Sequence, residues 1–120
     1  MAGGAMVKIA VTAFTLGWSH TVQKSRWEEV WRIDGDRLVL LEARIQGSGA
    51  GMEPPPEARL KGGWYRWKPV AAPQPSLSLA LSREGGDWDL CLGRAGCAPL
   101  GGWLPERSDQ VLLKACPISG

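Results

Sequence analysis

Hydrophobic and polar residues alternate along much of this chain, and the alternation predicts short β-strands. Phe14, Leu16 and Trp18 are separated by Thr15 and Gly17. A period of two is typical of a strand with one buried and one exposed face. The same alternation predicts strands over residues 77–81 and 88–92. We also expect a short aromatic strand over residues 64–68 and a final strand over residues 111–116.

Turn signals predict how some of these strands are connected. Asp34-Gly35 separates residues 26–33 from residues 37–45, and Asp-Gly between two strand patterns is a strong signal for a β-hairpin. The two Trp at positions 27 and 31 would also share a face of a helix over residues 23–32, but the adjacent turn favours the strand. Glu84-Gly85-Gly86-Asp87 predicts a second hairpin, between residues 77–81 and 88–92.

Glycine and proline restrict what the rest of the chain can form. The 120 residues include 16 Gly and 9 Pro, which are costly inside helices. Pro54-Pro55-Pro56 and the preceding glycines predict a loop over residues 46–62. We therefore expect an all-β protein, an antiparallel sandwich or partly open barrel of seven or eight short strands. Its expected organisation is a single domain over residues 9–117, an N-terminal extension over 1–8, either added or left from a trimmed export segment, and a tail over 118–120.

Charge and aromatic content argue against a polyanionic partner. Lys and Arg number 14 against 12 Asp and Glu, a net charge of +2, which is too small to indicate nucleic acid or an anionic membrane. Basic and aromatic residues do intermingle, as in surfaces that stack on single strands, but seven Trp beside one Phe are better explained as core residues. The intermingled residues are Lys24, Arg26, Trp27, Trp64, Tyr65, Arg66, Trp67 and Lys68.

The chain shows no pattern that indicates catalysis. Ser19 and His20 are adjacent, and neighbours in a strand point to opposite faces, so they are not a nucleophile and its base. Gly47, Gly49 and Gly51 lack the spacing and the following helix of a dinucleotide-binding loop. We expect a non-enzymatic protein without cofactor or metal.

His20 has two interpretations. His20 is two residues after Trp18, so in a strand it continues the apolar face of Phe14, Leu16 and Trp18. There it could be a histidine at the edge of the core. It could equally line a cleft between Trp18 and the glycine-rich loop, as a polar group does in a binding site. If a small ligand binds there, we expect it to contact Trp18, His20 and the loop that contains Gly49 and Gly51.

The three cysteines allow more than one arrangement. Cys91 and Cys97 flank five residues that include two glycines, so a disulfide across a tight turn is reasonable. Free thiols, or a metal site made of Cys91, Cys97, Cys116 and His20, are the alternatives, although zinc sites usually contain closer cysteine pairs. A disulfide would indicate a location outside the cytosol.

The run from Phe14 to Lys24, FTLGWSHTVQK, followed by Glu28-Glu29, resembles a bacterial family known as domain of unknown function 1850. Gly49-Ala50-Gly51-Met52 resembles its glycine-rich segment, and Leu90-Cys91 with Cys97 is similar to a late stretch of some members. The resemblance covers residues 12–104. The resemblance singles out four residues and one loop as candidate ligand contacts beside Trp18: Ser19, His20, Lys24, Glu29 and the loop from Gly49 to Gly51.

The resemblance implies a location and a partner but no reaction. Members of the family carry an N-terminal export segment, and any membrane anchor would lie in such a segment, which is absent from this sequence. They are similar to small periplasmic or membrane-anchored proteins encoded beside TRAP-type solute transporters of the TAXI class. The expectation is an extracytoplasmic, non-catalytic accessory protein of such a transporter. The alternative is a module that binds a carboxylate or an amino-acid-like ligand.

Overall fold

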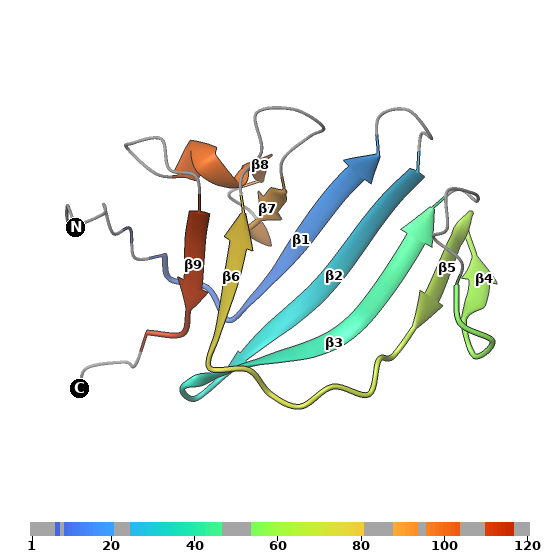
Figure 1. Cartoon of the computed structure of the whole chain (residues 1–120), viewed down its shortest axis with the longest axis horizontal. Helices are drawn as coiled ribbons and strands as arrows, with labels where there is room; N and C mark the ends of the chain where they lie inside the picture. The colour runs from blue at the N-terminus through green and yellow to red at the C-terminus, as the bar shows by residue number, and fades with distance from the viewer. Residues whose placement is uncertain are drawn as a thin grey trace.

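The protein is all-β in the part that the structure describes. The computed structural model describes residues 7, 9–20, 25–46, 54–80, 88–93, 96–103 and 110–116, with the backbone alone at residues 20, 80 and 101. These residues form nine strands and one short 3-10 helix (Figure 1). They are β1 (Ala13–His20), β2 (Ser25–Asp34), β3 (Arg37–Gln46), β4 (Arg59–Lys61), β5 (Trp64–Trp67), β6 (Ser76–Ala80), β7 (Asp89–Cys91), β8 (Cys97–Pro99), η2 (Leu100–Trp103) and β9 (Gln110–Lys114).

The strands form two antiparallel sheets. The larger sheet has the order β4-β5-β3-β2-β1-β7-β8, and β6 pairs with β9 in a separate two-stranded sheet. Figure 1 shows β1, β2 and β3 as long neighbouring strands, with β5 and β4 at one side and the β6–β9 pair toward the other. The larger sheet stays open, so of the two expected architectures the structure resembles the sandwich.

The predicted hairpin at Asp34-Gly35 is confirmed as the β2–β3 pair. Asp34 pairs with Arg37, so the two turn residues are Gly35, at a φ of +62°, and Asp36. A β-bulge follows along the hairpin, because Trp31 pairs with Leu40 whereas Val30 pairs with Glu42. The extra residue shifts the alternation of β3 by one position.

The hydrophobic core lies between the two sheets. Leu16 and Leu38 from the larger sheet are almost completely buried, and Val111 from β9 faces the same cluster. Leu77, Leu79 and Leu113 of the small sheet pack against it. The other buried members are Phe14, Trp31, Leu90, Leu92, Leu100 and Ala115.

Two sequence predictions about the connections are wrong. The loop expected over residues 46–62 contains β4, which pairs with β5 across Gly62-Gly63, both at positive φ, as tight hairpin turns require. The second predicted hairpin does not form, because β6 pairs with β9 while β7 pairs with β1 and β8. The two strands lie in different sheets, which lets Leu90 enter the core opposite Leu16.

The tryptophans contribute less to the core than the sequence indicates. Trp31, with 5% of its surface exposed, is the only Trp among the fully buried residues that the structure describes, and Trp88 and Trp103 pack against the core. Trp103 Nε1 also donates a hydrogen bond to the Leu90 carbonyl at 3.2 Å. Trp18, Trp27, Trp64 and Trp67 are half-buried, which leaves aromatic surface on both faces of the larger sheet.

The predicted disulfide is confirmed. Cys91 and Cys97 pair across the β7–β8 hairpin with their Cα atoms 4.0 Å apart. Gly93 and Gly96 in the connecting turn have positive φ values of +59° and +82°. Because both sulfur atoms are bonded to each other, Cys91 and Cys97 are unavailable as metal ligands. Cys116 is a free, exposed cysteine.

Candidate functional site

The larger sheet has one apolar and one charged face, because side chains alternate along each strand. Phe14, Leu16 and Trp31 belong to the apolar face, which packs against β6 and β9. On the opposite face, one row of cross-strand neighbours passes through β7, β1, β2, β3, β5 and β4. In this order, the row consists of Asp89, Gly17, Glu28, Arg44, Arg66 and Arg59.

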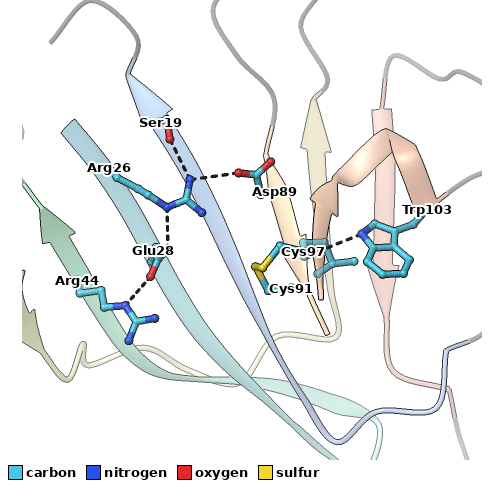
Figure 2. Close-up of a disulfide and its surroundings, with 9 residues drawn as sticks. Ser19, Arg26, Glu28, Arg44, Asp89, Cys91, Cys97 and Trp103 are labelled. Atoms are coloured by element: carbon cyan, nitrogen blue, oxygen red, sulfur yellow. Dashed lines mark hydrogen bonds and ion pairs between the residues drawn. A yellow bond between two sulfur atoms is a disulfide. The ribbon is translucent and has the colours of Figure 1, made fainter. Parts of the chain in front are cut away.

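Arg26 is the central residue of a group of polar contacts on the charged face (Figure 2). Its Nε donates a hydrogen bond to Glu28 Oε2 at 2.7 Å. Its Nη1 donates to Ser19 Oγ at 2.9 Å and to Asp89 Oδ2 at 3.1 Å. Glu28 accepts a second hydrogen bond at its Oε1, from Arg44 Nε at 2.7 Å. The guanidinium of Arg26 thus connects β2 to β1 and β7, and the Glu28 carboxylate connects β2 to β3.

The charged contacts continue toward the edge of the sheet. Arg66 Nη1 donates a hydrogen bond to Glu42 Oε1 at 3.2 Å, and Arg44 Nη1 lies 4.0 Å from the same oxygen. The guanidinium of Arg44 also lies 5.5 Å from the centre of a Trp64 ring, within the range of a cation–π contact. We call this alternating series of charges the ion ladder: Asp89, Arg26, Glu28, Arg44, Glu42 and Arg66.

The ion ladder stabilises the charged forms of Arg26 and Glu28. Burial alone would raise the pKa of the Glu28 carboxyl, but the hydrogen bonds and charges of Arg26 and Arg44 outweigh it and lower this pKa. For Arg26, burial acts to lower the pKa, and the hydrogen bonds and charges of Glu28 and Asp89 raise it overall. Glu28 is therefore ionised at neutral pH and is poorly suited to exchange protons there.

The small size of Gly17 leaves room for the Arg26 side chain to reach Asp89. Gly17 lies on β1 between Glu28 and Asp89, and it is buried under the guanidinium of Arg26. A Cβ atom at position 17 would overlap that guanidinium. The absence of a side chain at this position is what lets an arginine on β2 cross β1 and reach a carboxylate on β7.

We expect Gly17→Ala to act in opposite directions in two backgrounds. In the natural sequence it should lower the free energy of unfolding by about 1 kcal/mol, because Arg26 must give up its bonds to Asp89 and Ser19. In an Arg26→Ala background it should stabilise by about 0.5 kcal/mol, since alanine is preferred to glycine inside a strand. Urea denaturation followed by tryptophan fluorescence measures both values. If Gly17→Ala changes the free energy of unfolding in the same direction in both backgrounds, then Gly17 is not required to accommodate Arg26.

A second carboxylate, Glu29, lies on the apolar face. Trp27 Nε1 donates a hydrogen bond to Glu29 Oε2 at 3.0 Å, and Trp31 Nε1 donates to Glu29 Oε1 at 3.1 Å. Trp27 pairs with Trp18 across the β1–β2 ladder and makes an edge-to-face contact with Trp67, with ring centroids 5.5 Å apart. Glu29 therefore orients two indole groups, with one carboxylate oxygen for each.

The residues predicted to bind a ligand are divided between the faces. Ser19 belongs to the charged face through Arg26, whereas Trp18 and Glu29 lie on the apolar face beside Trp27. His20 ends β1, where its backbone pairs with Ser25. Three predicted residues lie outside the described part of the chain, and with them one side of the expected cleft: Lys24, Gly49 and Gly51.

Sequence reasoning missed most of the ion ladder. Arg26 and Arg66 entered only as basic residues among aromatics, and Glu28 only as half of a Glu-Glu pair. The available signal was opposite charge on strands expected to pair, such as Glu28 in residues 26–33 and Arg44 in residues 37–45. The contact between Arg26 and Asp89, 63 positions apart, depends on β7 pairing with β1, which no local pattern indicates.

The hydrogen bond that Ser19 makes on the charged face does not activate its hydroxyl as a nucleophile. The Ser19 hydroxyl accepts its hydrogen bond from a guanidinium, which cannot remove the hydroxyl proton. Activation of a serine requires a neighbouring base. Arg26 and Glu28 instead bond to each other and present fixed charges at a partly exposed surface.

Comparison with known proteins identifies a matching family profile. The profile of a family described as "Domain of unknown function (DUF1850)" matches residues 14–100. No curated protein and no solved structure matches the chain significantly. The matched region contains both faces of the larger sheet, including every residue of the ion ladder.

Proposed function

The chain belongs to the DUF1850 family of domains of unknown function, and on this premise we propose that it is a non-catalytic binding protein that acts outside the cytoplasm. In this proposal its partner is a component of a TRAP-type (TAXI) solute transporter, as the resemblance in its first motif implies. The observation that carries the proposal is the ion ladder, a partly exposed sheet face with charges already held in position.

The ion ladder favours an interface over a catalytic site. Its arginines and carboxylates are half-buried and bonded to one another, so they need little reordering when a partner with complementary charge binds. Complementary fixed charges increase the specificity and the rate of association. Catalytic acids and bases need pKa values near the working pH, whereas the pKa of Glu28 is shifted away from neutrality.

The disulfide supports a location outside the cytoplasm. Disulfides persist in oxidising compartments, which include the periplasm and the extracellular space, and the bond between Cys91 and Cys97 is compatible with either. In the described part of the chain, no helix has the length and apolar character needed to cross a membrane.

Site-specific photo-crosslinking in membranes that contain the transporter tests the proposal. A photoreactive residue at Val30 would report on the charged face, because Val30 is half-buried and pairs with Glu42. The matched control is a photoreactive residue at Leu112, which is 60% exposed on β9 in the other sheet. We expect the probe at position 30 to form an adduct with a transporter component and the probe at position 112 to form none.

Variants of the ion ladder make this experiment specific. Arg44→Glu reverses one charge of the face and should abolish the adduct at position 30, while circular dichroism shows that the fold is retained. No adduct with a transporter component, or an adduct equally strong in the Arg44→Glu variant, would contradict the proposal.

The alternative is a module that binds a carboxylate or an amino-acid-like ligand. A surface hollow elsewhere than the expected cleft supports it. That cleft requires the loop over residues 49–51, which lies outside the described part of the chain. The described residues instead contain a basic hollow at the β4–β5 side of the charged face.

A further inference from the structure

A surface hollow of about 330 Å³ lies where β5 separates from β3. On the β3 side, β5 pairs with the last four residues of β3, from Ala43 to Gln46. The first part of β3 therefore extends beyond the end of β5. Leu41 and Glu42, at the β-bulge, both line the hollow although they are consecutive residues. The bulge therefore contributes to its shape, as bulges commonly redirect side chains.

The lining of the hollow is strongly basic. It includes Arg59 and Lys61 from β4 and Arg66 and Lys68 from β5 and its end, against the single carboxylate of Glu42. Arg66 is the only one of these four cations with an ion pair, to Glu42 at 3.2 Å, among the residues that the structure describes. The hollow thus has three more positive than negative charges, although the whole chain has a net charge of only +2.

Protection of the sheet edge does not account for this arrangement. Charged residues on an edge strand prevent edge-to-edge association, which explains Arg59 and Lys61 on β4. Arg66 lies on the inner strand β5, between β3 and β4. Its guanidinium makes one hydrogen bond, to Glu42, and its Nε is buried without an acceptor among the described residues. Among the described residues, the remaining N–H groups of Arg66 have no hydrogen-bond acceptor, so they are available to bind a ligand.

We propose that the hollow binds an oxyanion with two or more negative charges. Guanidinium groups bind carboxylate or phosphate oxygens in pairs, and ammonium groups add point charges around them. A monovalent anion would neutralise only part of the excess charge, which is why the proposal specifies a polyvalent one. The oxyanion can be free in solution or can belong to the headgroups of an anionic membrane, because both sources present the same phosphate oxygens to the guanidinium and ammonium groups.

Titration calorimetry of the folded protein with pyrophosphate, citrate and acetate tests this inference. We expect pyrophosphate or citrate to bind at low ionic strength, with an affinity that falls as salt is added, and acetate to show no binding. In the Arg59→Gln/Lys61→Gln variant, and separately in Lys68→Gln, the Kd should rise about tenfold or more.

A matched control removes the same number of positive charges elsewhere. Arg32 and Arg37 lie at the β2–β3 turn and are about half exposed, and among the described residues their ion pairs are to Asp34 and Asp36, at 3.8 Å. The Arg32→Gln/Arg37→Gln variant should retain the Kd of the natural sequence. An equal loss of affinity in this control would show a general charge effect and would overturn the assignment of the site.

Vesicles distinguish the two sources of the oxyanion. Binding to phosphatidylglycerol vesicles but not to phosphatidylcholine vesicles, lost in the Arg59→Gln/Lys61→Gln variant, would assign the hollow to a membrane surface. Binding of the soluble anions alone would assign it to a free ligand. The inference is overturned if neither soluble polyvalent anions nor anionic vesicles bind. These results are independent of the crosslink at Val30, so each proposal can fail without the other.

Discussion

Glu28→Gln lowers the free energy of unfolding by about 2 kcal/mol at neutral pH, between the values typical of exposed and of buried ion pairs. The Glu28 side chain is 14% exposed, and each of its oxygens accepts a hydrogen bond at 2.7 Å from a different arginine. Glutamine has the same size but no charge, and its amide nitrogen is a donor facing one of the two guanidinium groups. Urea denaturation of the two proteins measures the loss.

The same substitution removes an acid-sensitive contribution to stability. The folded-state pKa of Glu28 is lowered from its ordinary value of 4.5. A carboxyl of this kind stabilises the fold at pH values above its unfolded-state pKa, and the contribution is lost as the pH falls through the folded-state pKa. The difference in unfolding free energy between the natural protein and Glu28→Gln should therefore be constant down to about pH 5 and shrink below it.

Asp36→Asn is the matched control for the loss of one negative charge. Asp36 is 83% exposed in the β2–β3 turn and lies 3.8 Å from Arg37. We expect this substitution to change stability by less than about 0.5 kcal/mol. If Asp36→Asn costs as much as Glu28→Gln, or if the difference for Glu28→Gln persists in acid, the ion ladder does not stabilise the fold in the way inferred.

The sequence predicts the strands well because period-two alternation reports directly which face of a strand is buried. The alternation around Phe14, Leu16 and Trp18 identifies β1, and Asp34-Gly35 identifies the β2–β3 hairpin. Gly62-Gly63 is an equally local hairpin signal, between residues 59–61 and 64–67. The nearby prolines concealed it, because they favoured a loop over the whole segment.

Register is harder to predict, and the ion ladder depends on it. A hairpin with Gly35 and Asp36 as its turn pairs Glu28 with Ala43 if no residue is inserted. The bulge shifts this pairing by one position, so that Glu28 pairs with Arg44. The same shift places Leu38, Leu40, Ala43 and Ile45 on a common face, although their numbers change from even to odd. Such a change of parity in an apolar run is a sequence signal for a bulge.

Pairing between distant strands could not be predicted from local patterns. The alternating segments 77–81 and 88–92 are separated by a glycine-rich turn, which looks the same whether the strands pair or change sheet. The larger sheet gains β7 beside β1, where Leu90 is buried opposite Leu16. The contact between Arg26 and Asp89 follows from this pairing and became visible only in the structure.

The run from Phe14 to Lys24, which resembles the DUF1850 family, contributes to both faces of the sheet. Gly17 and Ser19 accommodate and bind Arg26 on the charged face, while Trp18 packs on the apolar face. Motif residues next to each other in sequence therefore take part in two separate arrangements. Ser19 and Trp18, both predicted to contact one ligand, thus lie on opposite faces of β1.

Glu29→Leu should lower the free energy of unfolding by about 2 kcal/mol. It removes the acceptor of two indole N–H groups, and an unsatisfied buried donor costs about 1–3 kcal/mol. Trp31 is 5% exposed and cannot replace Glu29 with water, whereas Trp27 is half-buried and can do so in part. Glu29→Gln should cost about half as much, because its amide oxygen still accepts one indole hydrogen bond. Urea denaturation followed by circular dichroism gives both values.

A double-mutant cycle with Trp27→Phe tests whether the hydrogen bond itself causes the loss. Phenylalanine keeps much of the ring but removes the N–H donor at position 27, so Glu29→Leu should cost about 0.5–1 kcal/mol less in that background. Glu57→Gln, at an exposed turn residue, is the control for charge alone and should be nearly neutral. If Glu29→Leu has the same cost with and without the Trp27 indole, then Glu29 does not act as the acceptor that orients this aromatic surface. Glu29 would then have a role other than its hydrogen bonds to Trp27 and Trp31, such as direct contact with a ligand.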